Sequence, residues 1–232
     1  MSDNFAEFSR APDRPGRPAP NPMVALLLGV VIVALLVAGV VGVAIHHAPP
    51  ATAAGVTPAG YQRVTDTVDH MSLAVPAGWM ILSLTRGQLI AQLQAVKAGH
   101  PELAALLDLA AASLQTIQPG VFGIDVATRT TLFSYGVDAG GIKKVSDIAT
   151  SEVIAPFTSI GAQNIHATRI HLPIGDAEQV SAQLPIGTLT VTEVLDYFVL
   201  NHRVVALVLA ARGSAPPTTL FHQIEQTLAV AP

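Results

Sequence analysis

The chain has 232 residues, of which 50% are hydrophobic and 12% are charged, and its formal net charge is −4. A weakly acidic chain of this kind is not expected to take nucleic acid or anionic lipid headgroups as its principal partner. It contains no cysteine, which excludes disulfide bonds, a lipid-modified amino-terminal cysteine and a cysteine nucleophile. A folded domain in this chain must therefore be stabilised by its apolar core.

The amino-terminal 45 residues predict a tail followed by a membrane span. Residues 1–22 contain five prolines and three arginines but few large apolar side chains, so we expect a disordered cytoplasmic tail. Residues 23–45 carry no charged or strongly polar side chain. As a helix this run would be about 34 Å long, enough to cross a hydrocarbon core of roughly 30 Å.

The charges on either side of the span predict its orientation. Arg10, Arg14 and Arg17 precede it, whereas the first cation after it is Arg63. Basic residues stay in the cytoplasm, so the carboxyl-terminal part is expected to be extracytoplasmic and the protein to be a single-pass signal-anchor of the cell membrane. A cleaved signal peptide is the alternative, because Ala-Thr-Ala-Ala at 51–54 resembles a cleavage site, although the apolar run is long for one.

One face of the predicted span carries small residues. Ala34, Ala38 and Gly42 recur every four residues, and small side chains at this spacing let two helices approach closely in lipid. This stripe predicts a face for self-association, although alanine and glycine are common in spans.

A linker and one domain follow the span. Residues 46–60 are a mixture of Pro, Ala, Thr and Gly without periodicity, which is typical of an extended linker. Residues 61–232 are long enough to bury one apolar core but too short to form two domains with a stable core each. The three arginines of the tail are balanced by three acidic residues, so the outer part carries the whole net charge of −4.

The domain alternates between strand and helix patterns. Alternating or β-branched runs separated by turn residues predict strands, and apolar residues at helical spacing predict helices. The Pro76-Ala77-Gly78 turn and the Asn201-His202 hairpin tip separate consecutive strands. We expect strands at 71–75, 79–84, 121–127, 131–137, 163–172, 177–184, 189–200 and 203–211. We expect helices at 86–99, at 101–114, from the N-cap Ser146 to Ile160, and from Ser214 to Leu228.

This order of elements resembles a known family. The run Leu73-Ala-Val-Pro-Ala-Gly-Trp79, the antiparallel series with its hairpin at Asn201 and the final helix closing on Thr227-Leu-Ala-Val230 resemble the PsbP-like fold, and in particular the actinobacterial LpqN-type envelope proteins. The resemblance implies an α+β domain, an antiparallel sheet flanked by helices in an α/β/α sandwich, with binding or assembly roles rather than catalysis. Lipoprotein members carry a lipobox cysteine, whereas this chain has a predicted transmembrane helix before the domain.

The sequence contains no recognisable catalytic, cofactor-binding or metal-binding motif. It lacks a Gly-x-Ser-x-Gly elbow, a phosphate-binding Walker loop and a His-Glu-x-x-His zinc motif. Asp66 and Asp69, with the adjacent His70, form one candidate cluster, and Asp176 and Glu178 form a second. Such acidic pairs are the minimum for acid–base chemistry or for binding a divalent cation. Solvated turn charges explain the same residues, so no catalytic residue, metal site or cofactor is predicted.

Four residues are candidates for a ligand or partner surface. Gln179, Ser181 and Gln183 alternate on one predicted strand and form a polar face, and Trp79 is the single tryptophan. An ordinary solvent-facing sheet explains the polar face equally well, and a tryptophan in a strand region more often packs against the sheet.

Three functions remain open. The first is a non-enzymatic binding or assembly factor that acts on an unknown envelope protein outside the membrane. The second is a sensing or carrier domain that holds a small molecule or lipid between the sheet and the helices at 86–115. The third is an unrecognised hydrolase, for which Asp176 and Glu178 are the only candidate catalytic site.

Overall fold

The computed structural model of the chain describes residues 56–83, 85–99, 118–125, 127–128, 130–186, 189–213 and 218–231. The predicted tail, membrane span and most of the linker lie outside these residues, as do the predicted helix at 101–114 and the stripe of Ala34, Ala38 and Gly42. In the part of the chain that is described, no helix has both the length and the apolar character that a membrane crossing requires.

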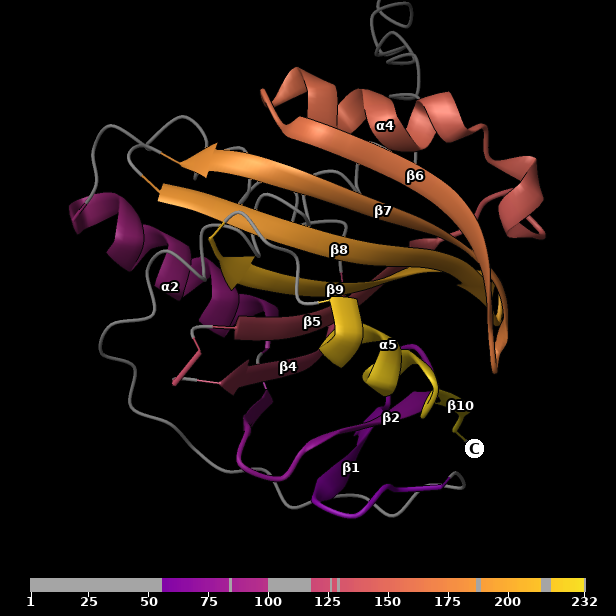
Figure 1. The fold of residues 1–232 in the computed structure, drawn as a ribbon, viewed down its shortest axis with the longest axis horizontal. Coiled ribbons are helices and arrows are strands. Elements are labelled where there is room, and N and C mark those ends of the chain that lie inside the picture. The colour runs from indigo at the N-terminus through magenta and orange to yellow at the C-terminus, as the bar shows by residue number, and fades with distance from the viewer. Residues whose placement is uncertain are drawn as a thin grey trace, which may run out of the picture.

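A seven-stranded antiparallel sheet forms the centre of the domain (Figure 1). Its strand order is β3-β4-β5-β9-β8-β7-β6, so β6 and β3 are its two edges. The bounds are β3 Met80–Ser83, β4 Gln118–Asp125, β5 Thr130–Asp138, β6 Gln163–Leu172, β7 Gly175–Ile186, β8 Leu189–Leu200 and β9 Arg203–Arg212.

A small second sheet packs beside the first. It has the order β1-β2-β10, with β1 Tyr61–Asp66, β2 Met71–Pro76 and β10 Ala229–Val230. The Pro76-Ala77-Gly78 turn therefore separates two strands of different sheets, because β2 belongs to the small sheet and β3 to the large one. In Figure 1 the small sheet lies at the opposite end of the molecule from β6.

Helices cover both faces of the large sheet. Gln179 of β7 donates to Glu225 in α5 (Thr218–Glu225), whereas its neighbour Glu178 accepts from Thr150 in α4 (Thr150–Ser159). Adjacent residues of a strand point to opposite faces, so α5 and α4 lie on opposite sides of the sheet. The predicted antiparallel sheet flanked by helices is confirmed. The remaining helix, α2, spans Arg86–Gly99 as expected.

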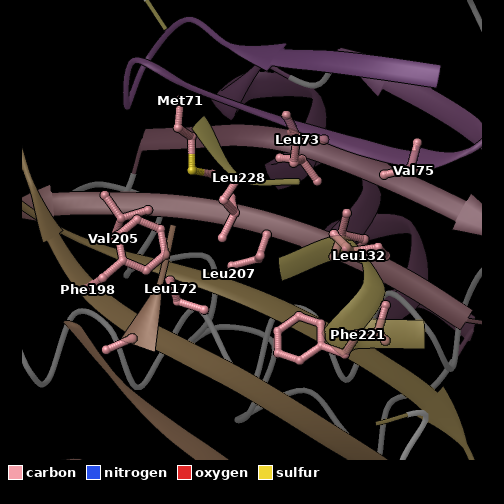
Figure 2. Close-up of a cluster of buried hydrophobic side chains, with 14 of the residues drawn as sticks. Met71, Leu73, Val75, Leu132, Leu172, Phe198, Val205, Leu207, Phe221 and Leu228 are labelled. Atoms are coloured by element: carbon pink, nitrogen blue, oxygen red, sulfur yellow. The ribbon is translucent and has the colours of Figure 1, made fainter. Parts of the chain in front are cut away.

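The apolar core lies between the α5 face of the large sheet and the small sheet. Figure 2 shows Leu73 of β2, Leu207 of β9 and Leu228 after α5 turned toward the same interior, and all three are buried. Burying one such side chain contributes roughly 1.5–3 kcal/mol. This core therefore fastens the carboxyl-terminal segment and the small sheet to the large sheet.

The strand predictions agree closely with the structure, and the hairpin at Asn201-His202 is confirmed. Both of its residues have positive φ, 49° and 61°, as the primed turns of two-residue hairpins require. The strands β1 and β10 were not expected from the sequence.

The prediction that Ser146 caps a helix is wrong. The Asp147 carboxylate accepts from the backbone N–H groups of Lys143 and Lys144, which closes a short 3-10 turn at Val145–Asp147. Ile148 is extended and buried, so α4 begins only at Thr150.

Candidate functional site

The three polar candidates on β7 share one face, as predicted. Gln179, Ser181 and Gln183 are half-buried and lie on the face that α5 covers in part. Ser181 lies opposite His166 of the edge strand β6, and Asn164 of β6 donates to Oε1 of Gln183 at 2.7 Å. The polar face therefore extends from β7 onto β6, whose side chains are mostly exposed.

The structure does not bring Trp79 to this face. Its side chain is 7% exposed, belongs to the apolar core and lies over Gly123 of β4. Three strands separate β4 from β7 in the sheet order. Trp79 therefore packs in the core, away from the polar face.

The first acidic pair is brought together as a structural cluster. Asp66 accepts from the backbone N–H groups of Val68 and Asp69 and, at 2.6 Å, from the hydroxyl of Ser134 on β5. Asp69 pairs with Arg203 of β9. Burial, followed by the nearby Asp66 carboxylate, raises the pKa of Asp69 to about 6. Both carboxylates fix the β1–β2 turn onto the large sheet.

The second acidic pair also lies on one face of its strand. Glu178 is buried and accepts from the Arg169 guanidinium at 3.1 Å and from the Thr150 hydroxyl at 2.9 Å. Asp176 is exposed and lies 2.9 Å from Nδ1 of His171. Each carboxylate is thus engaged by its own neighbour, and no cluster of three or more metal-ligating side chains occurs among the described residues.

Sequence reasoning missed a second group of buried acids on the α5 face. Asp196 of β8 and Glu225 of α5 both accept from the side-chain amide of Gln179, at 3.0 and 2.8 Å. Nδ1 of His222 lies 3.1 Å from the second carboxylate oxygen of Glu225. Burial and the neighbouring Glu225 raise the pKa of Asp196 well above its ordinary value. The available signal was an acidic residue flanked by large side chains of a predicted strand, Leu195 and Tyr197.

The opposite face of β8 carries a further buried acid. Glu193 is 0% exposed, lies between Ala182 of β7 and Ala210 of β9, and neither of its carboxylate oxygens has a hydrogen-bond partner. Burial raises the pKa of Glu193 well above its ordinary value. Burial without a hydrogen-bond partner therefore favours the neutral form of this side chain.

Replacing Glu193 with glutamine is expected to stabilise the domain by about 1–3 kcal/mol at neutral pH. The folded-state pKa is raised, so the unfolded chain loses this proton at lower pH than the folded domain. The Glu193 carboxyl therefore lowers the free energy of unfolding progressively as pH rises above the ordinary pKa of glutamate. Glutamine does not ionise, so it removes this loss. Urea denaturation of the full chain in micelles, followed by Trp79 fluorescence at pH 7.5 and 4.5, measures the difference.

The exposed Glu152 provides the control, because Glu152→Gln is expected to change stability little at either pH. The expected gain for Glu193→Gln shrinks toward zero near pH 4.5. A Glu193→Gln chain that is less stable than the wild type at pH 7.5 would contradict a neutral Glu193.

Comparison with known proteins gives a structural likeness. No protein family matches the chain, and no curated protein matches it in sequence. The solution structure of cyanobacterial PsbP (CyanoP) from Synechocystis sp. PCC 6803 is similar with a TM-score of 0.46 and 15% identity, over 79% of this chain and 99% of that one. The crystal structure of LpqN, involved in cell envelope biogenesis of Mycobacterium tuberculosis, is similar with a TM-score of 0.37 and 12% identity, over 78% and 91%. The expected resemblance to PsbP-like and LpqN-type proteins is confirmed as a likeness.

Proposed function

We propose that this chain is a non-enzymatic, single-pass membrane-anchored protein whose extracytoplasmic domain binds or assembles a partner protein of the cell envelope. The observation that carries the proposal is the polar face of β6 and β7, defined here by Asn164, His166, Thr168, Ser181 and Gln183. These side chains are exposed or half-buried, and they line an edge strand of ten residues.

The position of this polar face fits an anchored protein. The predicted linker enters the domain at β1, an edge strand of the small sheet, whereas β6 lies at the other end of the molecule (Figure 1). A domain tethered at its β1 end would present the polar face away from the membrane. An edge strand also carries backbone N–H and C=O groups without a partner strand, which a bound protein segment can pair with.

Three of the four acidic residues offered for chemistry support binding over catalysis, whereas Asp176 is exposed and lies beside His171. Asp66, Asp69 and Glu178 are buried. The bonds of the two aspartates hold the β1–β2 turn on the large sheet, and the bond from Thr150 to Glu178 holds α4 there. A general acid or base has to reach the proton that it transfers. These three side chains are turned into the structure instead.

The test is photocrosslinking of the full chain in intact cells. A photoreactive amino acid at His166 or Thr168 of the polar face is expected to capture one predominant envelope protein. The matched control places it at Ala127, an exposed position in the β4–β5 loop. Equal capture from Ala127, or no specific product from either position of the polar face, would refute the proposed function. Protease protection in the same cells tests the orientation.

A further inference from the structure

The contact between α5 and the large sheet contains two carboxyl groups held by one amide. Gln179 has a single side-chain NH2 group, and it donates to Asp196 and to Glu225 at 3.0 and 2.8 Å. Asp196 is 0% exposed and Glu225 is 3% exposed. Two ionised carboxylates this close and this buried repel each other, so the arrangement favours one proton on the pair.

The end of the helix lies at this contact. Glu225 is the last residue of α5, and the carbonyl end of a helix carries a partial negative charge. The only basic side chain in contact with Glu225 among the described residues is His222, at 3.1 Å and largely exposed. Among the described residues no lysine or arginine contacts either carboxyl group, which leaves a shared proton as the way to relieve the repulsion between them.

The other titratable groups on this face already have structural partners or lie at its rim. Asp66 and Asp69 come from the β1–β2 turn and bond to Ser134 and Arg203. His166 lies on the exposed β6. The strands β5 and β9 place Ser134 and Leu207 in the same cross-strand row as Asp196. None of these groups supplies a positive charge to Asp196.

We propose that Gln179, Asp196, His222 and Glu225 form a proton-dependent latch that holds α5 on the sheet. When a proton is shared between the two carboxyl groups, Gln179 satisfies both and α5 stays docked. When that proton is lost, the two charges repel across the contact and α5 detaches more readily. This inference goes beyond the proposed function, because it requires no partner protein.

Detachment of α5 would uncover a specific apolar surface. Phe221 and Ile224 of α5 and Leu228 after it are buried against the core that also contains Leu207 of β9 (Figure 2). The latch therefore couples the pH of the surrounding solution to exposure of the core face of the sheet.

The direction and size of the effect follow from proton linkage. The docked state holds a proton that the detached state releases at the ordinary pKa of an exposed aspartate, about 4. Rising pH therefore weakens docking by up to tenfold per pH unit, from about pH 4 up to the raised pKa of Asp196 in the docked state.

Hydrogen exchange of the full chain in micelles tests the latch. We expect the protection factors of α5 amides, corrected for the intrinsic pH dependence of exchange, to fall by up to about 100-fold between pH 5 and 7, while those of β9 stay constant. In Asp196→Asn, which keeps an acceptor for Gln179 but cannot ionise, α5 protection should be independent of pH.

Glu225→Gln is the second variant and should also remove the pH dependence, which keeps the test decisive if one variant folds poorly. Glu152→Gln, on the exposed side of α4, should behave as the wild type. The latch is refuted if α5 protection in the wild type does not change with pH, or if both amide variants retain the full dependence.

Discussion

Replacing Gly120 with alanine is expected to destabilise the domain by about 3–5 kcal/mol, through overpacking and lost buried hydrogen bonds. A methyl group at Gly120 would occupy space that the Asp66 carboxylate and the Ser134 hydroxyl already fill. Asp66 is 1% exposed and accepts three hydrogen bonds. Moving it would leave buried donors without partners, and moving β4 would disturb its pairing with β3 and β5.

Gly136→Ala should have a similar effect at the neighbouring contact. Its added methyl group would lie 2.8 Å from both Cγ of Asp69 and Nη2 of Arg203, an ion pair of which the carboxylate is fully buried. At these two positions the missing side chain on β4 and β5 leaves the space in which the acidic residues of the β1–β2 turn pack.

Urea denaturation of the full chain, followed by the fluorescence of Trp79, measures both effects. Gly78→Ala is the matched control, because nothing lies within 4 Å of the added methyl group and φ is not positive there. Its expected change is below about 0.5 kcal/mol. If Gly120→Ala is no less stable than Gly78→Ala, the β1–β2 turn does not dock on β4 as described.

Replacing Arg63 with methionine is expected to cost about 2–4 kcal/mol. The Arg63 side chain is buried and, unusually, no carboxylate of the described residues accepts from it. Its guanidinium donates instead to the backbone carbonyls of Thr227 and Val56 and to the hydroxyls of Ser72 and Thr57, at 2.9–3.2 Å. Methionine keeps much of the apolar stem but leaves the buried carbonyl of Thr227 without this donor.

Arg63→Lys should recover little of that loss, because an ammonium group cannot reproduce the planar arrangement of donors. Arg212→Met, at the exposed end of β9, is the control and should stay within about 0.5 kcal/mol of the wild type. The same fluorescence-detected denaturation applies. A lysine variant as stable as the wild type would mean that the charge of Arg63, rather than its geometry, holds the contact.

The sequence predicted β6 to β9 well because their β-branched and alternating residues, and the hairpin at Asn201-His202, are local signals. The strand β1 carries the opposite signal. Its buried positions are Arg63 and Asp66, so hydrophobic periodicity does not reveal it. The two-residue strand β10 exists only because Ala229 and Val230 pair with β2, more than 150 residues earlier.

The candidate site shows the same division between local and distant information. The shared face of Gln179, Ser181 and Gln183 follows from the two-residue period of a strand. The sequence could also suggest that Asp66 and Asp69 lie close together. It could not show that Ser134 would bond to Asp66 and Arg203 to Asp69, because these partners lie far apart along the chain. For the same reason it could not show that Glu225 and Asp196 would share the amide of Gln179.

The position of Arg63 has a mechanical consequence. A pull on the amino-terminal linker reaches the domain at Val56 and then at Tyr61, the residue of β1 that pairs with Pro76 at the end of β2. Loading an antiparallel pair from one end opens its backbone hydrogen bonds one after another, with little resistance from each. Arg63 is the third residue of this strand, and it is bonded at once to β2 and to the turn after α5. Tension on the linker would therefore be shared between β1, β2 and the carboxyl-terminal segment before it reached the seven-stranded sheet.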